Sequence, residues 1–227
     1  MLLDWGGTLA VHGTTELIDL WRAAAVVLDP QREDELTDAL MQVEARSWAK
    51  TQTTQRSARL MDLLREASDE LGLDVAEAVL ETAQRAHLDA WTPTIRHVPE
   101  AAEVLVALRE RGLAIGLLSN THWPRSFHEQ FLQRDGLAAL IDQRVYTSEI
   151  DWIKPHPEPF LRLGTALEVD PHDCVFVGDR PIDDISGAAG VGMRTVWIAN
   201  DYAPGEGSLA DAAITDLTQL IDVITRW

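Results

Sequence analysis

The spacing of apolar residues changes at residues 91–93, and this change limits the fold more than any other feature of the 227-residue chain. Before it, over residues 15–90, apolar side chains recur at the spacing of amphipathic helices. Breaks at Asp29-Pro30, around residues 51–54 and at Gly72 divide this stretch into four predicted helices. A bundle of helices is therefore expected here.

After this point, short apolar runs alternate with helical patterns. Such alternation predicts a parallel sheet with helices on both faces. The opening segment, residues 1–4, belongs to the same sheet, so the fold class is α/β with the helical bundle as an insertion. The predicted strands are 113–118, 144–147, 174–177 and 195–198, and the predicted helices are 99–111, one from about 124, 158–167, 182–191 and 216–224.

Composition excludes several classes of protein. The chain has 19 basic and 37 acidic residues, a net charge of −18, which disfavours broad contact with nucleic acid or an anionic membrane. Cys174 is the single cysteine, so an intrachain disulfide or a cysteine-based zinc site is excluded. The first residues, MLLDWGG, have no basic region and no signal-like apolar segment, and a cytoplasmic protein is expected.

Polar residues follow the predicted strands at their carboxyl ends, where ligands collect in open parallel sheets. Taken singly, each is typical of a turn or helix cap. Together, the carboxylates are suited to Mg²⁺, and a hydroxyl, backbone amides and one ammonium are suited to a phosphate. Of the chain's two lysines, Lys50 and Lys154, the second lies in this set. The residues are Asp4 to Thr8, Ser119, Asn120, Lys154, Asp179, Asp183 and Asp184.

Four segments resemble motifs of the haloacid dehalogenase-like hydrolase superfamily. They are LLDWGGTL at the start, LLSNT at 117–121, KPHPEPF at 154–160 and VFVGDRPIDDISGAAGVGM at 175–193. The resemblance implies a Rossmann-like core of residues 1–13 and 92–227, with residues 14–91 as a helical cap over the site. It also implies a Mg²⁺-dependent hydrolase, most simply a phosphatase for a small phosphorylated metabolite.

The resemblance implies a role for each matched residue. Asp4 is the expected nucleophile, which forms an aspartyl-phosphate intermediate. Lys154 is expected to neutralise charge between Asp4 and the phosphoryl group. Thr8 and Ser119 are expected to hydrogen bond near the nucleophile, and Gly7 and Asn120 to bind phosphate. The expected Mg²⁺ ligands are Asp4, the carbonyl of Gly6, Asp179 and Asp184, with Asp183 as the alternative to Asp184.

Gly6 departs from the pattern of the family's phosphatases, which carry an aspartate there for acid–base catalysis. Three interpretations remain open. In the first, the protein is a phosphatase for substrates with good leaving groups, or a phosphatase in which His12 or His122 acts as the general acid. It is a phosphonatase-like hydrolase of a C–P bond that uses Lys50 as a Schiff base. Or it binds a phosphorylated ligand with weak turnover. Dehalogenation is less expected. That branch of the family needs no metal, whereas the acidic pair typical of its Mg²⁺-dependent members is present here.

Substrate choice is expected to depend on the cap, where the sequence says little. Trp5, next to the nucleophile, has the best claim to shape the pocket. Six cap side chains are candidates for a stacking and anion-binding surface, although tryptophans usually pack between helices and arginines usually lie in solvent. They are Trp21, Arg22, Arg46, Trp48, Lys50 and Arg56.

Overall fold

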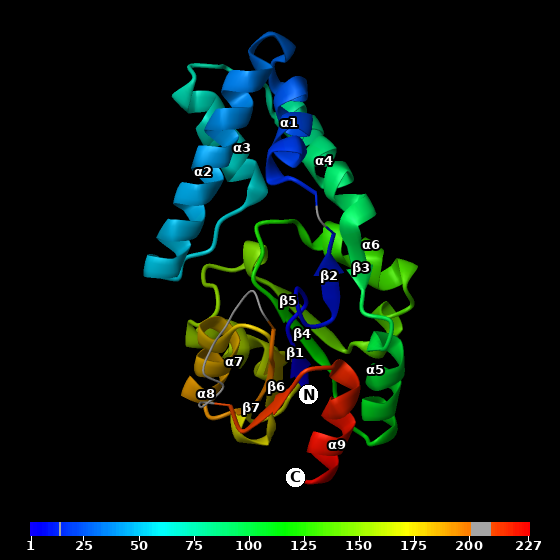
Figure 1. The fold of residues 1–227 in the computed structure, drawn as a ribbon. Helices are drawn as coiled ribbons and strands as arrows, with labels where there is room; N and C mark the ends of the chain where they lie inside the picture. Colours follow the sequence, from blue (N-terminus) through cyan, green and yellow to red (C-terminus); the bar gives the residue numbers. More distant parts are fainter. Residues whose placement is uncertain (14, 201–209) are drawn as a thin grey trace.

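The computed structural model describes residues 1–13, 15–200 and 210–227, without the side chain of His12. Six parallel strands form one sheet in the order β5-β4-β1-β6-β7-β8. The sheet confirms the predicted α/β class and places the first strand at its centre (Figure 1). The strands are β1 (Leu2–Leu3), β4 (Gly116–Ser119), β5 (Gln143–Tyr146), β6 (Val175–Gly178), β7 (Arg194–Ile198) and β8 (Ala212–Ile214).

Helices cover both faces of this sheet because successive side chains of a strand point to opposite faces. Leu3 joins the apolar cluster that contains side chains of α5 (Ala101–Glu110), α6 (Arg125–Arg134) and α9 (Leu220–Thr225). Its neighbour Leu2 joins a second cluster with α7 (Pro157–Ala166) and α8 (Gly187–Gly190). The central strands are continuous apolar runs in the sequence because both of their faces are buried.

The helical insertion leaves the sheet through a narrow neck of two antiparallel strands, β2 (Ala10–His12) and β3 (Ile95–His97). Between them lie α1 (Leu17–Leu28), α2 (Glu33–Thr54), α3 (Leu60–Glu70) and α4 (Glu77–Trp91), as the apolar spacing predicts. They stand together above the carboxyl ends of the core strands (Figure 1). None of the helices in the described part of the chain is both long and apolar enough to cross a bilayer.

A second attachment joins the cap to the core, at the segment between α2 and α3. This cap linker, residues 55–59, runs beside the core loop that precedes Lys154. The amide of Ser57 donates to the carbonyl of Asp151 at 3.0 Å, and the amide of Ile153 donates to the carbonyl of Gln55 at 2.9 Å. The guanidinium of Arg56 lies 3.8 Å from the ring centre of Trp152. The cap is therefore held at the neck and at this linker.

Several elements differ from their predictions. The strand expected from Leu113 begins only at Gly116, and the helix expected over 182–191 is a π-helix (Pro181–Ser186) followed by the short α8. The wide turn lets the Asp184 carboxylate accept hydrogen bonds from backbone amides of the preceding loop. The final helix begins as a 3₁₀ turn at Leu217–Gln219. Three short strands, β2, β3 and β8, have too few residues to show a periodic signal.

Candidate active site

The three central strands bring the predicted functional residues to one edge of the sheet. Asp4 follows β1, Ser119 is the last residue of β4, and Asp179 follows β6. Because β4, β1 and β6 are parallel neighbours, their carboxyl ends meet. Asp4 and Asp179 are both buried, at 5% and 1% exposure, as is Ser119 at 3%. The sheet topology alone thus gathers residues separated by up to 175 positions.

Lys154 reaches this edge from the loop before α7. Its Nζ atom lies 2.6 Å from an Oδ1 atom of Asp4 and 2.6 Å from Oδ1 of Asp184, and it donates to the carbonyl of Leu118 at 3.2 Å. The Asn120 side chain fixes the backbone of Lys154 on both sides. Its Nδ2 donates to the Lys154 carbonyl at 3.0 Å and its Oδ1 accepts from the Lys154 amide at 2.9 Å. The Asn120 side chain therefore fixes the backbone from which Lys154 reaches Asp4, a contact that was not predicted from the sequence.

Asp184 is held in place by its own loop. Its Oδ2 atom accepts hydrogen bonds from the amide of Asp179 at 3.1 Å and from that of Arg180 at 2.9 Å. The position before Asp179 must be glycine, because a Cβ at Gly178 would lie 2.4 Å from the Asp184 carboxyl carbon. Asp183 lies on the cavity wall instead, half-buried.

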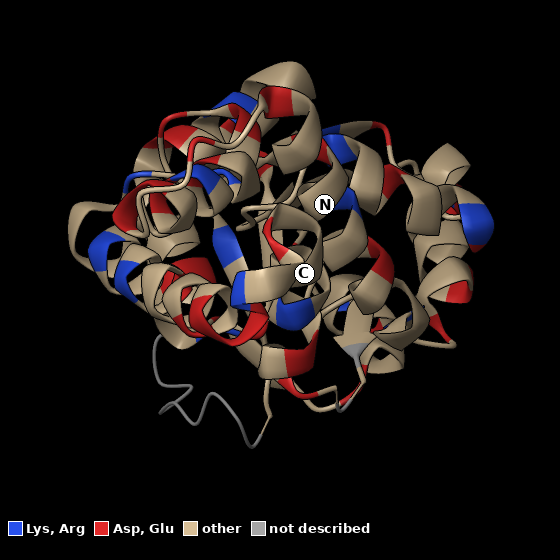
Figure 2. Cartoon of the chain, turned by 90° about the horizontal axis from the view of Figure 1, so that it is seen from above, with Lys and Arg blue, Asp and Glu red and all other residues tan. Residues whose placement is uncertain are grey.

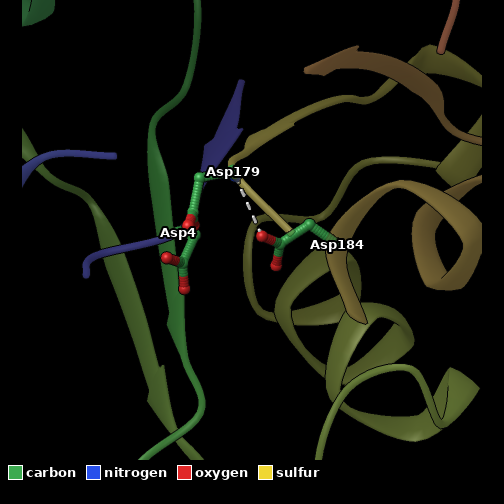
Figure 3. Close-up of side chains that lie close together, drawn as sticks. All are labelled: Asp4, Asp179 and Asp184. Atoms are coloured by element: carbon green, nitrogen blue, oxygen red, sulfur yellow. Dashed lines mark hydrogen bonds between the residues drawn. The ribbon is translucent and has the colours of Figure 1, made fainter. Parts of the chain in front are cut away.

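The carboxylates of Asp4, Asp179 and Asp184 form one buried cluster (Figure 3). One oxygen from each lies within 4.8 Å of the others. With Lys154 the ionised group carries three negative charges and one positive charge, a net −2. A divalent cation bound by carboxylate oxygens would neutralise this excess. The donor set therefore fits Mg²⁺, which prefers oxygen ligands.

Burial and charge act on this group in opposite directions. Burial raises the pKa of Asp4; Lys154 opposes the rise, and the charges of Asp184 and Asp179 add to it. Burial alone would lower the pKa of Lys154, but attraction to Asp184 and Asp4 outweighs it and raises that pKa. The ammonium is therefore charged at neutral pH, and the carboxylates around it gain from a further positive charge.

The loop after Asp4 turns back over the site. Gly7 has φ +82°, a conformation that favours glycine, and its amide donates to the carbonyl of Ala10 at 2.7 Å. Thr8 is buried, and its Oγ1 atom has no hydrogen-bond partner among the described residues. Trp5 is 2% exposed and donates from its indole nitrogen to Nε2 of His97 at 3.1 Å. Gly6 offers backbone atoms only to the cavity that it lines.

A cavity of about 660 Å³ lies between this edge and the cap. Its core wall includes Asp4, Ser119, Lys154 and Asp179, so the predicted chemistry faces it directly. The neck and cap contribute a different surface, which is apolar and aromatic except for one carboxylate. These residues are Val11, Leu17, Glu44, Trp48 and Trp91.

Two histidines were candidates to replace the acid that Gly6 lacks. His122 lines the cavity, is 7% exposed, and stacks on Trp48 of the cap with ring centres 4.1 Å apart. Its Nε2 atom has no hydrogen-bond partner among the described residues, and burial lowers its pKa to about 4. The ring is therefore neutral at pH 7. His12 ends β2, and its side chain lies outside the described part of the chain.

The other cap candidates mostly lie elsewhere. Lys50 is exposed and is absent from the described residues that line the cavity. Trp21 is buried inside the cap, where its indole nitrogen donates to Glu44 at 2.6 Å. Of the six cap side chains named from the sequence, Trp48 alone lines the cavity; Arg22, Arg46 and Arg56 pair with acidic residues.

Sequence reasoning missed several residues of the cavity wall, chiefly Glu44, Trp91 and Trp123. Glu44 and Trp48 are four positions apart on α2, so a helical projection places both on one face and could have linked them. Trp91 and Trp123 lie 5.1 Å apart between ring centres although 32 positions separate them. Nothing in the local sequence signals that pairing.

A Rossmann-like sheet with a buried aspartate cluster at its carboxyl edge and a helical cap above it defines a class of capped α/β hydrolases. The haloacid dehalogenase-like hydrolase family matches residues 1–192, and the chain belongs to this family. The matched span covers the four segments that resemble the family's motifs, except for Met193, and confirms the resemblance inferred from the sequence.

Similar proteins include both phosphatases and dehalogenases. A glyceraldehyde 3-phosphate phosphatase of Pyrococcus furiosus is 34% identical over 58% of this chain and 56% of its own length. A phosphoserine phosphatase of Thermus thermophilus is 30% identical over 70% of this chain and 62% of its own length. The matches thus span a little over half of these relatives. The structure of a 2-haloacid dehalogenase from Pseudomonas syringae has a TM-score of 0.70 at 25% identity, covering 100% of this chain and 97% of that one.

Proposed function

We propose that this protein is a Mg²⁺-dependent phosphatase that acts on a small phosphorylated substrate through an aspartyl-phosphate at Asp4. The observation that carries the proposal is the contact of Lys154 with both Asp4 and Asp184 beside Asp179. This arrangement supports phosphoryl transfer over dehalogenation, because an acidic cluster suited to a metal ion has no use in displacing a halide. The names of the two relatives found by sequence, both phosphatases, support the same chemistry.

In the proposed reaction an Asp4 oxygen attacks phosphorus and the bond from phosphorus to the leaving oxygen breaks. Water then attacks the phosphorus of the aspartyl-phosphate, which releases inorganic phosphate and restores the Asp4 carboxylate. Lys154 stabilises negative charge on the transferring group as a point charge. Thr8, Ser119, Gly7 and Asn120 are proposed to hold the phosphoryl oxygens or the nucleophile.

Mg²⁺, when bound, would supply charge neutralisation for the phosphoryl group. Asp4, Asp179 and Asp184 would hold it, with the Gly6 carbonyl as a further proposed ligand. The cap is proposed to comprise residues 14–91, and the core residues 1–13 and 92–227. In this division the cap sets the substrate while the core performs the chemistry.

The family's phosphatases protonate the leaving group with an aspartate side chain at the position of Gly6, and glycine cannot do this. Neutral His122 offers a hydrogen-bonding nitrogen at the cavity wall, but its lowered pKa makes it a poor proton store at pH 7. We therefore expect acyl and aryl phosphates to be hydrolysed faster than sugar phosphates, whose leaving groups need a proton. The exposed position of Lys50 gives no support to a Schiff-base mechanism on a phosphonate.

The decisive test is hydrolysis of acetyl phosphate with Mg²⁺ by the native chain and by Asp4→Asn. The native chain should release phosphate, and Asp4→Asn should lose at least about 1,000-fold in kcat because the nucleophile is gone. Equal rates would refute the mechanism. A thermal shift with phosphate and Mg²⁺ but no turnover of any phosphate ester would instead favour a binding protein.

A further inference from the structure

Tryptophans form part of the wall of the cavity that contains Asp4 and Lys154. Four of the chain's eight tryptophans line this one cavity, namely Trp5, Trp48, Trp91 and Trp123. Trp91 and Trp123 have ring centres 5.1 Å apart, and Trp5 and Trp123 meet edge to face at 6.4 Å. Such rings offer planar apolar faces and edges, which favour other aromatic rings by stacking and edge contacts.

Trp48 is the member of this wall best placed to contact a ligand. It is 36% exposed while it lies on the cavity, and one face of its ring is already stacked on His122. Trp48 therefore joins the cap to the core residue His122, and it lies in the same cavity as Asp4. A ring bound against Trp48 would extend the stack that His122 begins.

The charged residues of the cavity wall also favour a leaving group without a carboxylate. The basic residues among the described lining residues are Lys154 and Arg180, and both belong to the core. The cap contributes no cation to this lining and places Glu44 there instead. Glu44 accepts the indole hydrogen bond of Trp21 at 2.6 Å. A leaving group with a carboxylate would find no cationic partner on the cap and would meet the acidic side chain of Glu44.

The volume of the cavity and the chemistry of an aryl leaving group are both compatible with an aromatic substrate. A volume of about 660 Å³ exceeds the need of a three-carbon phosphate ester and lies within the ordinary range for drug-sized ligands. An aryloxide is also a stable leaving group, so that the missing side chain at Gly6 costs less for an aryl ester than for an alkyl ester.

We propose that the tryptophan wall, centred on Trp48, is a binding site for the leaving group, and that this leaving group carries an aromatic ring system without charged substituents. The inference rests on the proposed phosphatase function. When the bond from phosphorus to the aryl oxygen breaks, the electron pair leaves with that oxygen as an aryloxide, which takes a proton from water. Asp4 retains the phosphoryl group until hydrolysis.

The test compares kcat/KM for 2-naphthyl phosphate and acetyl phosphate, with Mg²⁺, in four full-length forms. These are the native chain, Trp48→Ala, Trp48→Phe and Trp227→Ala. Trp48→Ala should lower the naphthyl-to-acetyl ratio about 5- to 100-fold, the range expected for loss of one aromatic stack. Trp48→Phe should restore most of the ratio because it keeps a ring. Trp227 is 43% exposed and lies away from the cavity lining, so Trp227→Ala is the matched control and should keep the native ratio.

A second comparison tests the charge preference. The native chain should hydrolyse phenyl phosphate at least tenfold more efficiently than 3-carboxyphenyl phosphate, and Glu44→Gln should narrow that gap. Thermal unfolding of each variant identifies any that fails to fold, and Trp48→Phe then carries the test. An unchanged ratio in Trp48→Ala, or equal use of the two phenyl esters, overturns the inference while acetyl phosphate is still hydrolysed. If the native chain hydrolyses none of these phosphate esters, the proposed function itself is refuted.

Discussion

The ammonium of Lys154 and the carboxylate of Asp4 are in direct contact, 2.6 Å apart and both buried, although 150 positions separate them in the chain. The same ammonium contacts Asp184 at 2.6 Å. One lysine thus compensates two buried carboxylates, and Asp4 depends on this ammonium for its charged state, because burial and the neighbouring Asp184 both disfavour the charge.

Removal of this ammonium should damage both activity and stability. Lys154→Ala leaves Asp4 and Asp184 buried without a counterion, and loss of one partner of a buried ion pair costs about 3–5 kcal/mol. We expect a lower free energy of unfolding by that amount in the absence of metal, together with loss of acetyl phosphate hydrolysis. Urea denaturation and steady-state kinetics measure the two effects.

Lys154→Arg is the informative companion, because it keeps the charge but replaces a compact ammonium by a planar fork. It should recover part of the stability and little of the activity. Native-like rates in Lys154→Arg would show that charge alone, without the ammonium geometry, meets the need of the site.

A methyl group at Gly178 should displace Asp184. Its Cβ would lie 2.4 Å from the Asp184 carboxyl carbon, so the carboxylate must move away from Lys154 and from the amide of Asp179. Gly178→Ala should therefore lose at least about tenfold in kcat and require more Mg²⁺ for half-maximal activity. Gly190→Ala is the matched control, since nothing lies within 4 Å of a Cβ there, and it should behave as the native chain.

Mg²⁺ should stabilise the folded protein through the aspartate cluster. At a free concentration about 100 times the Kd, a ligand that binds only the folded state adds about 2.7 kcal/mol. We expect a higher melting temperature with Mg²⁺, reversal by EDTA, and loss of turnover in EDTA. Asp179→Asn should melt at the same temperature with and without Mg²⁺. A full Mg²⁺ response in that variant would place the ion elsewhere.

Acid should weaken the cap through His87. This side chain is 1% exposed, accepts from the indole of Trp91 at 3.1 Å, and lies 3.2 Å from the carbonyl of Leu20. Burial lowers its pKa from 6.5 to about 4. The folded state therefore binds fewer protons than the unfolded state between these values, so its contribution is complete above pH 6.5 and falls as pH drops towards 4.

The full shift in the pKa of His87 corresponds to a decrease of about 3 kcal/mol in the free energy of unfolding, reached near pH 4. Urea denaturation at pH 7, 6 and 5 should show this decline. His87→Gln should have a shallower decline over the same range, with the remainder due to His122 and His97, whose pKa values are also lowered by burial. An equal slope in the variant would assign the pH dependence to other groups.

The order of elements and the residues that gather at the candidate site could be predicted from the sequence because both leave local signals. Apolar spacing located the four cap helices, and short motifs located Asp4, Lys154 and the Asp179–Asp184 loop. The cavity wall could not be predicted, because it depends on how the cap lies over the core. Trp91 and Trp123 meet only through that arrangement, and the π-helix at Pro181–Ser186 depends on hydrogen bonds to a side chain rather than on helical propensity.

The surface charge follows the composition without adding a site. Acidic and basic residues are interspersed over the helices in Figure 2, in keeping with a net charge of −18 that is spread around the chain. A phosphate ester therefore approaches a repulsive surface, and the basic side chains that the described cavity lining offers it are Lys154 and Arg180. The rate of association should rise with ionic strength, as expected for partners of like charge.

The two lysines also differ in what a reagent can reach. Lys154 is 2% exposed and locked between two carboxylates, whereas Lys50 lies in solvent on α2 of the cap. Of the lysine side chains, an amine-directed dye should therefore modify Lys50 and spare Lys154. The folded protein thus offers a single reactive lysine on the cap, at which a fluorophore can be placed without touching the aspartate cluster.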